Sequence, residues 1–266
     1  MIALVDSDIV AYRCAASAEG EEPGIALARV DELMERILFN TNADSYRAFI
    51  GGKDNFRYKY NPQYKANRTQ PKPIHLQACR DWLVSEWKAE IVNGMEADDA
   101  LGINQTTETV ICSIDKDLRQ IPGQHFNFVK LDWTEVDEYT SHYNLYRQFI
   151  EGDKSDNIIG MYGMGPKRAE KELYGLHPDE MFNRVRELYQ DDKRMLMNGH
   201  CLYIWRKEND VWPYSRELGQ VAESCSNENS LEKQNFTEPT TIKIEDGFLV
   251  NGTRTEPFEE QINHVV

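Results

Sequence analysis

Hydrophobic positions in the first half of the chain follow two alternating spacings. Short apolar runs predict buried strands at residues 2–5, 46–50, 109–114 and 126–131. Between these runs, apolar residues three and four positions apart predict helices over 25–39 and 75–90, and an acidic segment from residue 93 opens a further helix. Strands alternating with helices indicate an α/β fold with a largely parallel sheet, which we place at residues 1–135.

After about residue 133 the strand pattern stops. Helical spacing then predicts helices at residues 139–150, 166–174, 178–189 and 192–205, so residues 136–222 form a second, helical region. The chain becomes polar from residue 223 to 240, as in a linker. Residues 241–250 then alternate around Asp246-Gly247, a two-residue hairpin signal. The sequence assigns no role to residues 223–266.

Acidic residues follow two of the predicted strands. Asp6 and Asp115 come directly after strands, and the carboxyl ends of parallel strands meet at one edge of a sheet. Carboxylates gathered there repel one another, and divalent ions remove that cost. Magnesium prefers oxygen ligands, and two such ions can hydrolyse a phosphodiester. The candidate metal ligands are Asp6, Glu96, Asp98, Asp99, Asp115, Asp117, Asp153 and Asp156.

Each of these acids also has an ordinary structural interpretation. Acids at 96–99 suit the start of a helix. Asp115 and Asp117 suit a cap, and Asp153 and Asp156 suit a turn. Asp8 fits a structural role better than a catalytic one. The shared strand edge is what favours a metal site for the set as a whole.

The segment at residues 51–73 combines cations with tyrosines and shows no clear periodicity. Between residues 55 and 75 it contains Arg57, Lys65, Arg68 and two further lysines but no acid, so it is locally cationic. Tyr64 and two other tyrosines interleave with these cations. Such a composition suits an arched segment that stacks on unpaired bases and holds phosphates. The alternative is a solvated loop whose tyrosines pack on the domain.

A glycine-rich turn lies inside the helical region. Gly163 and Gly165 precede Pro166, which suits the first position of a helix. Free backbone N–H groups at such a helix start bind phosphate, and Lys167 and Arg168 add positive charge. We therefore predict a phosphate site at this turn.

Overall charge and cysteine content limit the classes of protein. A formal net charge of −15 is unusual for a protein that binds nucleic acid, so local basic segments must carry the contacts. The five cysteines are scattered and show no zinc spacing, which favours a reducing, cytoplasmic setting. The sequence shows no apolar run long enough to cross a membrane and no signal peptide pattern. We expect a monomer with no membrane partner.

Several of these stretches, in their order along the chain, resemble the 5′-nuclease family, which includes phage 5′→3′ exonucleases, flap endonucleases and the 5′-nuclease domain of bacterial DNA polymerase I. The matching stretches begin at Leu4, Phe56, Tyr64, Glu96, Asp115 and Gly152, and the last runs on through Gly163-Met164-Gly165-Pro166-Lys167. The resemblance implies a PIN-like α/β nuclease domain followed by a helix–three-turn–helix region that grips duplex DNA.

The resemblance also implies roles for particular residues. One Mg²⁺ would be held by the acids at 6, 96, 98, 115 and 117, and a second by Asp153 and Asp156, with Mn²⁺ able to substitute. Lys65 and Arg68 match arch residues that steer the scissile phosphate, and Arg57 matches a basic residue at the base of the arch. The glycine turn would hold a DNA phosphate together with K⁺.

One family feature is absent. Many members carry an aspartate just after the second strand, where this chain has Ile50-Gly51. Either Asp54 takes that place or one water-mediated metal contact is missing. With 266 residues there is also no room for a polymerase domain, so we expect a stand-alone nuclease.

The expected function is therefore metal-dependent hydrolysis at DNA 5′ ends, flaps or RNA primers, in phage replication or primer removal. Exonuclease and flap endonuclease activity stay open, as do DNA and RNA–DNA substrates. One alternative is a haloacid-dehalogenase-like phosphatase, since Asp6, Asp8 and Val10 fit its signature with Asp6 as nucleophile. Another is a non-catalytic protein that binds branched DNA.

Overall fold

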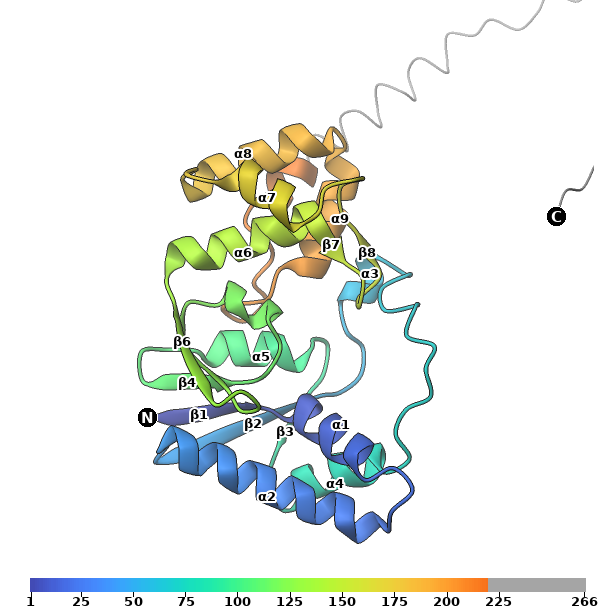
Figure 1. Cartoon of the computed structure of the whole chain (residues 1–266). Coiled ribbons are helices and arrows are strands. Elements are labelled where there is room, and N and C mark those ends of the chain that lie inside the picture. The colour runs from blue at the N-terminus through green and yellow to red at the C-terminus, as the bar shows by residue number, and fades with distance from the viewer. Residues whose placement is uncertain (220–266) are drawn as a thin grey trace, which may run out of the picture. The chain divides into compact units, whose positions relative to one another are not determined.

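The computed structural model describes residues 1–219 and contains a six-stranded sheet in the order β3-β2-β1-β4-β5-β6 (Figure 1). Four of the five pairings in this sheet are parallel, and the pairing of β5 with β6 at one edge is antiparallel. This confirms the predicted α/β fold. The strands are β1 (Ile2–Asp6), β2 (Ser45–Gly51), β3 (Glu90–Val92), β4 (Thr109–Cys112), β5 (Gly123–Asn127) and β6 (Asp132–Val136).

Two edge strands differ from the sequence-based prediction. The predicted helix over 75–90 ends at Ser85, and residues 90–92 form β3 at the edge of the sheet. The single strand predicted at 126–131 is instead the end of β5 and the turn into β6. Both edge strands carry mostly exposed or half-buried residues, so neither has the apolar run that identifies a buried strand.

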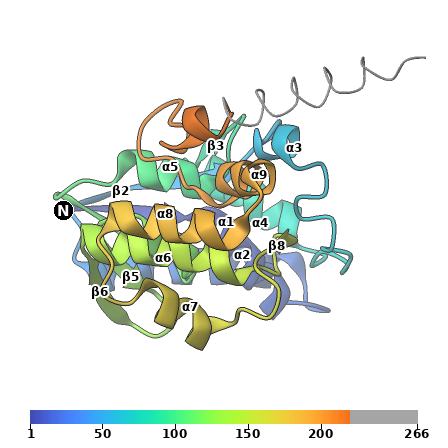
Figure 2. The ribbon, with the colours of Figure 1, turned by 90° about the horizontal axis from the view of Figure 1, so that it is seen from above.

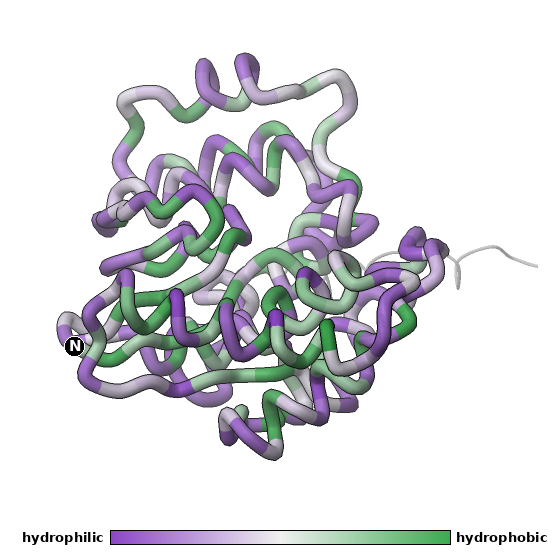
Figure 3. Tube along the Cα trace, turned by 60° about the horizontal axis from the view of Figure 1, so that its bottom comes forward, coloured by the Kyte–Doolittle hydropathy of each residue, from purple (hydrophilic) through white to green (hydrophobic). Residues whose placement is uncertain are grey.

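Helices cover both faces of the sheet. On one face, α1 (Ser7–Ser17), α2 (Pro23–Thr41) and α4 (Leu76–Ser85) pack around a common core (Figure 1). On the other face lie α5 (Ala97–Asn104) and the 3-10 helix η1 (Asp117–Gln120). Helix α2 shows why these segments fold as they do. Its buried residues recur at helical spacing, Pro23 occupies its first turn, and Asn42 ends it in a left-handed conformation. Hydrophobic and hydrophilic positions alternate along the helices of the chain in the same way (Figure 3).

The second region is helical, as predicted. It contains α6 (Glu138–Glu151), α7 (Pro166–Leu173), α8 (Pro178–Tyr189) and α9 (Asp192–Leu202), with a small ribbon of β7 (Gly152–Asp153) and β8 (Ile158–Ile159) (Figure 2). Its core gathers around the fully buried Phe149 and Trp212. After α9 the chain returns to the sheet, where Ile204 joins the core beneath α5. Both regions belong to one compact unit.

The basic segment links the two regions. After β2 it forms α3 (Arg57–Tyr60) and then runs from the helical region down to α4 (Figure 1). At its upper end the Lys65 amide donates to the Asp156 carbonyl over 2.9 Å. At its lower end the Ile74 amide donates to the Glu19 carboxylate over 3.3 Å, and the His75 ring bonds the Glu21 carbonyl over 2.8 Å. The segment, named here the arch (residues 51–75), is thus anchored at both ends.

None of the helices in residues 1–219 combines the length and the apolar character needed to cross a membrane. The predicted linker and hairpin at 223–266 lie outside the described residues.

A close contact in the helical core yields a stability prediction. A Cβ added at Gly199 would overlap the Trp212 ring, so Gly199→Ala should destabilise the fold by about 1–3 kcal/mol, as overpacking typically does. Gly24→Ala is the control, because no atom lies within 4 Å of that position. Urea unfolding followed by tryptophan fluorescence checks both. An unchanged midpoint for Gly199→Ala would contradict the packing described.

Candidate metal and nucleic-acid site

Asp6 fixes the position of the site at the end of the central strand. It ends β1 and caps α1, where its carboxylate accepts from the Ile9 amide over 3.2 Å. Ser113, just after the neighbouring strand β4, donates its hydroxyl to the same carboxylate over 2.7 Å. The side chain is only 2% exposed. Asp6 is therefore held rigidly behind the sheet edge rather than presented to solvent.

Most of the other predicted ligands gather around one small cavity. The cavity has a volume of about 60 Å³ and lies where the sheet edge meets the helical region. Acids from the helix start at 96, from the segment after β4 and from the β7–β8 ribbon all reach it. The carboxylates that line it are Glu96, Asp98, Asp115, Asp117, Asp153 and Asp156. The prediction that strand ends and the 152–157 stretch share one site is thus matched by the geometry.

Asp6 and three of the lining acids have no cation paired with them within residues 1–219. Burial raises the pKa of Asp6 to about 7 and that of Asp117 to about 8, with neighbouring carboxylates adding to the effect. Burial and the nearby Asp6 charge raise the pKa of Asp98 well above its ordinary value. The pKa of Asp115 is also raised, mainly by burial. Such a site favours protons or added cations.

Two arch cations pair with Glu96 and Asp156. The Lys65 ammonium pairs with Glu96 and lies 3.6 Å from Asp156, while the Arg68 guanidinium lies 2.5 Å from Asp156. Although burial opposes it, Arg57 and Lys65 keep the pKa of Glu96 below its ordinary value. The predicted catalytic residues Lys65, Arg68 and Asp115 therefore all line the cavity.

The donor set suits a hard divalent cation, with one limit on geometry. Six carboxylates line the cavity, and oxygen ligands suit Mg²⁺ or Mn²⁺. Within residues 1–219, however, no three acidic, histidine or cysteine side chains are arranged to hold one ion together. Each ion would thus have at most two direct protein ligands in this arrangement. Water would complete its coordination, as is usual for Mg²⁺.

Asp99 and Arg57 differ from their predicted roles. They form a buried pair with distances of 2.5 and 2.9 Å, and their exposed fractions are 0% and 1%. Asp99 also accepts from the backbone amides of Glu96 and Trp205, each over 3.0 Å. Arg57 donates to the carbonyls of Cys201 and Tyr203. Both carboxylate oxygens of Asp99 are thus bonded to protein groups, and the Arg57 guanidinium is buried within the protein.

Tyr64 also has a packing role instead of the predicted contact with DNA. It is 2% exposed, and its hydroxyl bonds Asp156 over 2.7 Å and Glu96 over 3.1 Å. Neither face of its ring is open to a base. This agrees with the alternative interpretation of the segment, in which its tyrosines pack on the domain. Tyr58 and Tyr60 are 49% and 42% exposed and remain available at the surface.

At the end of β2, where many members of the family carry an aspartate, this chain places the side chain of Asp8. The Asp8 carboxylate accepts from the Gly51 amide over 2.7 Å and pairs with Arg80, which also donates to the Gly51 carbonyl. Asp8 is structural, as expected, but it places a neutralised carboxylate next to the end of the second strand. Asp54 is exposed and does not line the cavity, so nothing supports its substitution for the missing acid. Arg80 carried no sequence signal for this contact.

The glycine turn has the predicted local structure. Gly163 has a positive φ of 70°, Gly165 caps α7, and Pro166 occupies the first turn of that helix. The Arg168 guanidinium donates to the Gly163 carbonyl over 2.7 Å and so braces the turn. Lys167 is exposed beside it. The turn does not line the acidic cavity, so it forms a separate surface.

The buried ion pair yields a test of this description. Arg57→Met leaves Asp99 buried without a cation and should lower the free energy of unfolding by about 3–5 kcal/mol. In the double variant Arg57→Met, Asp99→Leu, most of that loss should be recovered, because neither charge is then buried alone. Urea unfolding measures both variants. Equal destabilisation of the single and double variants would show that the pair does not act as a unit.

Known proteins were compared with the chain in sequence and in fold. No family model matches. DNA polymerase I of Bacillus caldotenax is 30% identical over 152 residues, which cover 47% of this chain and 17% of that protein. DNA polymerase I of Geobacillus stearothermophilus is 29% identical over 201 residues, covering 65% of this chain and 23% of that protein. The matched part is thus about a fifth of the length of these curated relatives.

Solved structures give the fold independently. T5 5′-exonuclease with bound zinc superposes with a TM-score of 0.63 at 16% identity, covering 87% of this chain and 98% of that one. T5 D15 protein co-crystallised with metal ions gives a TM-score of 0.56 at 18% identity, covering 87% and 98%. The sequence similarity and the fold together confirm the resemblance to the 5′-nuclease family that the motifs predict.

Proposed function

We propose that this chain is a divalent-metal-dependent 5′-nuclease that hydrolyses phosphodiester bonds at DNA 5′ ends or flaps. The observation that carries the proposal is the set of uncompensated carboxylates, Asp6, Asp98, Asp115 and Asp117, at one sheet edge. The protein keeps these charges buried although they lower its own stability, which fits a site completed by cations.

Two ions account for the distribution of acids. One would lie among Glu96, Asp98, Asp115 and Asp117 in front of Asp6, with at most two of these acids as direct ligands and the others acting through water, and the second would be held by Asp153 and Asp156. We assign Asp99 to the buried pair with Arg57 and not to either ion. Bound Mg²⁺ or Mn²⁺ would supply an activated water and neutralise the leaving oxygen of a phosphodiester.

Lys65 and Arg68 act on the substrate in this proposal. Without ions they pair with Glu96 and Asp156. Once added cations neutralise those acids, the ammonium and guanidinium are free to contact the scissile phosphate. Both sit on the arch, so they orient the phosphate from the side opposite the sheet edge.

DNA binding is assigned to the exposed turn at α7. Gly163, Gly165, Lys167 and Arg168 present backbone N–H groups and positive charge to a phosphate of duplex DNA. We propose K⁺ as a further ion at this turn. T5 D15 flap endonuclease is known in a complex with DNA and metal ions, at a TM-score of 0.55 and 15% identity. For this chain, a role in phage replication or primer removal, a monomeric state and a cytoplasmic location remain proposals.

The two alternative functions fit the geometry less well. A phosphatase that uses Asp6 as nucleophile needs an accessible oxygen, whereas Asp6 is 2% exposed with its oxygens bonded to Ile9 and Ser113. A protein that only binds branched DNA has no use for the acidic cavity, since unpaired carboxylates repel phosphate.

A doubly labelled 5′-flap substrate tests the activity. In Mg²⁺ or Mn²⁺ the protein should release 5′ products, and EDTA should abolish release. Asp153→Asn should lower kcat/KM at least about 100-fold, a loss of about 2.7 kcal/mol in transition-state stabilisation. Asp132→Asn, an exposed acid on β6, is the charge-matched control and should cleave normally. DNA binding without cleavage in either metal would overturn the proposal.

Stability measurements test the uncompensated charge separately. Because the pKa of Asp98 is raised in the folded state, its ionised form destabilises the fold as pH rises above about 3.9, the ordinary aspartate value. Asp98→Asn should therefore raise Tm in EDTA at pH 8 by at least about 3 °C, given about 2–4 °C per kcal/mol. The difference should vanish below about pH 4. Mn²⁺ should stabilise the variant less than the unaltered protein. A lower Tm for the variant at pH 8 would contradict the charge assignment.

A further inference from the structure

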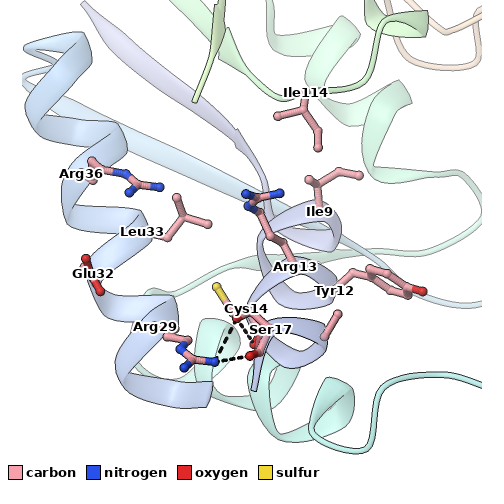
Figure 4. Close-up of a pocket in the computed structure, with 11 residues that line it drawn as sticks. Ile9, Tyr12, Arg13, Cys14, Ser17, Arg29, Glu32, Leu33, Arg36 and Ile114 are labelled. Carbon is pink, nitrogen blue, oxygen red and sulfur yellow. Dashed lines mark hydrogen bonds between the residues drawn. The ribbon is translucent and has the colours of Figure 1, made fainter. Parts of the chain in front are cut away.

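A large groove outside the acidic cavity lies between α1 and α2. Its volume is about 630 Å³, ten times that of the acidic cavity. Figure 4 shows Arg13 from α1 and Arg36 from α2 extending into the space between the helices, with Ile9 and Ile114 beyond Arg13. The 5′-nuclease motifs include none of these residues.

The groove is locally positive in a strongly acidic chain. Arg29 is held by Glu21 at 2.9 Å and by Ser17, whereas Arg13 and Arg36 have no side-chain hydrogen bond or ion pair within residues 1–219. Burial raises the pKa of the Cys14 thiol, which also lines the groove, to about 12, and the positive charges of all three arginines oppose that rise. Glu32 is the only carboxylate in the lining. Two unpaired guanidiniums therefore face the groove.

The position of the groove connects it to the proposed nuclease site. Ile9 lies one turn into the helix that Asp6 caps, and Ile114 directly precedes Asp115. At the other end, Ser17 and Arg29 adjoin the α1–α2 turn, where Glu19 and Glu21 anchor the lower end of the arch. The groove thus extends from the acidic sheet edge to the foot of the arch.

The chemistry of the lining suits a single nucleic-acid strand. Guanidinium groups bind phosphates with paired N–H donors, and their charge does not depend on pH. Tyr12 is 51% exposed at the rim of the groove, where its ring extends from α1 on the side away from α2, and Ile114 is 36% exposed (Figure 4). Such an aromatic and apolar surface stacks an unpaired base. Because the net charge of the chain is −15, this local positive charge distinguishes the groove as a place where a polyanion is attracted.

We propose that this groove binds the unpaired 5′ strand of the substrate beyond the scissile phosphate. Arg13 and Arg36 hold successive phosphates, and Tyr12 stacks on a base. This inference rests on the proposed nuclease function and assigns the path of the strand after it passes the arch. A strand long enough to reach the groove gains these contacts, and a one-nucleotide flap does not.

Flap length provides the test. In the double variant Arg13→Gln, Arg36→Gln, KM for a 15-nucleotide flap should rise about tenfold, whereas cleavage of a one-nucleotide flap should not change. The salt dependence of long-flap binding should also weaken by about 1.4 in slope, for two lost single-strand phosphate contacts. The double Arg→Lys variant should retain much of the affinity, because it keeps both charges. Lys207→Gln, a 79%-exposed cation elsewhere, is the control for net charge.

The outcomes separate this inference from the nuclease proposal. Unchanged long-flap KM, or equal loss on both flap lengths, would overturn the groove while leaving the nuclease activity established. If the unaltered protein cleaves neither flap, the nuclease proposal fails.

Binding of labelled dT15, measured by fluorescence anisotropy, then tests the groove by itself. Weaker dT15 binding by the double Gln variant would support binding in the groove, and equal binding would overturn it. Competition by dTMP as effective as that by dT15 would also overturn it, since a strand would then not be required.

Discussion

Repulsion among carboxylates at the sheet edge is the constraint around which the rest of the molecule is arranged. Asp6, Asp98, Asp115 and Asp117 come from different elements, and each loses hydration on folding. An isolated edge with this charge would open to water. Here the helical region closes over it, with Cys201, Leu202 and Ile204 lining the cavity beside the acids. The closed site keeps the carboxylates together around one small cavity.

The Arg57–Asp99 pair supplies much of the rigidity that this closure needs. Arg57 comes from the arch, Asp99 from α5, and the carbonyls of Cys201 and Tyr203 from the chain after α9. Three segments distant in sequence are thus joined by one side chain. Because both charges are fully buried and hydrogen-bonded, the pair specifies one arrangement of these segments. Glu96 and Asp98 lie just before Asp99 in the chain, so the buried pair also fixes their positions.

Sequence reasoning identified most of the fold and of the acidic site for one physical reason. Buried strands and amphipathic helices leave a periodic signal, and acids directly after strands must share an edge. It missed β3 and β6 because edge strands bury too little to show that signal. The buried contacts of Asp99, Arg57 and Tyr64 could not be predicted, because a motif gives the residue type but not its burial. Only the packed structure shows that Arg57 pairs with Asp99, and that the Tyr64 hydroxyl bonds Glu96 and Asp156.

The attachment of Lys65 to Glu96 and Asp156 has a thermodynamic consequence. Ions bound in the cavity as proposed would compete with the arch for the same oxygens, so the two would be negatively coupled. This coupling is reciprocal. If the docked arch lowers the affinity for ions by some factor, bound ions lower the affinity of arch docking by the same factor. An anion that binds Lys65 and Arg68 in place of the acids would remove this negative coupling. A phosphate placed between them would let arch and ions remain together, so full assembly of the site requires all three parts.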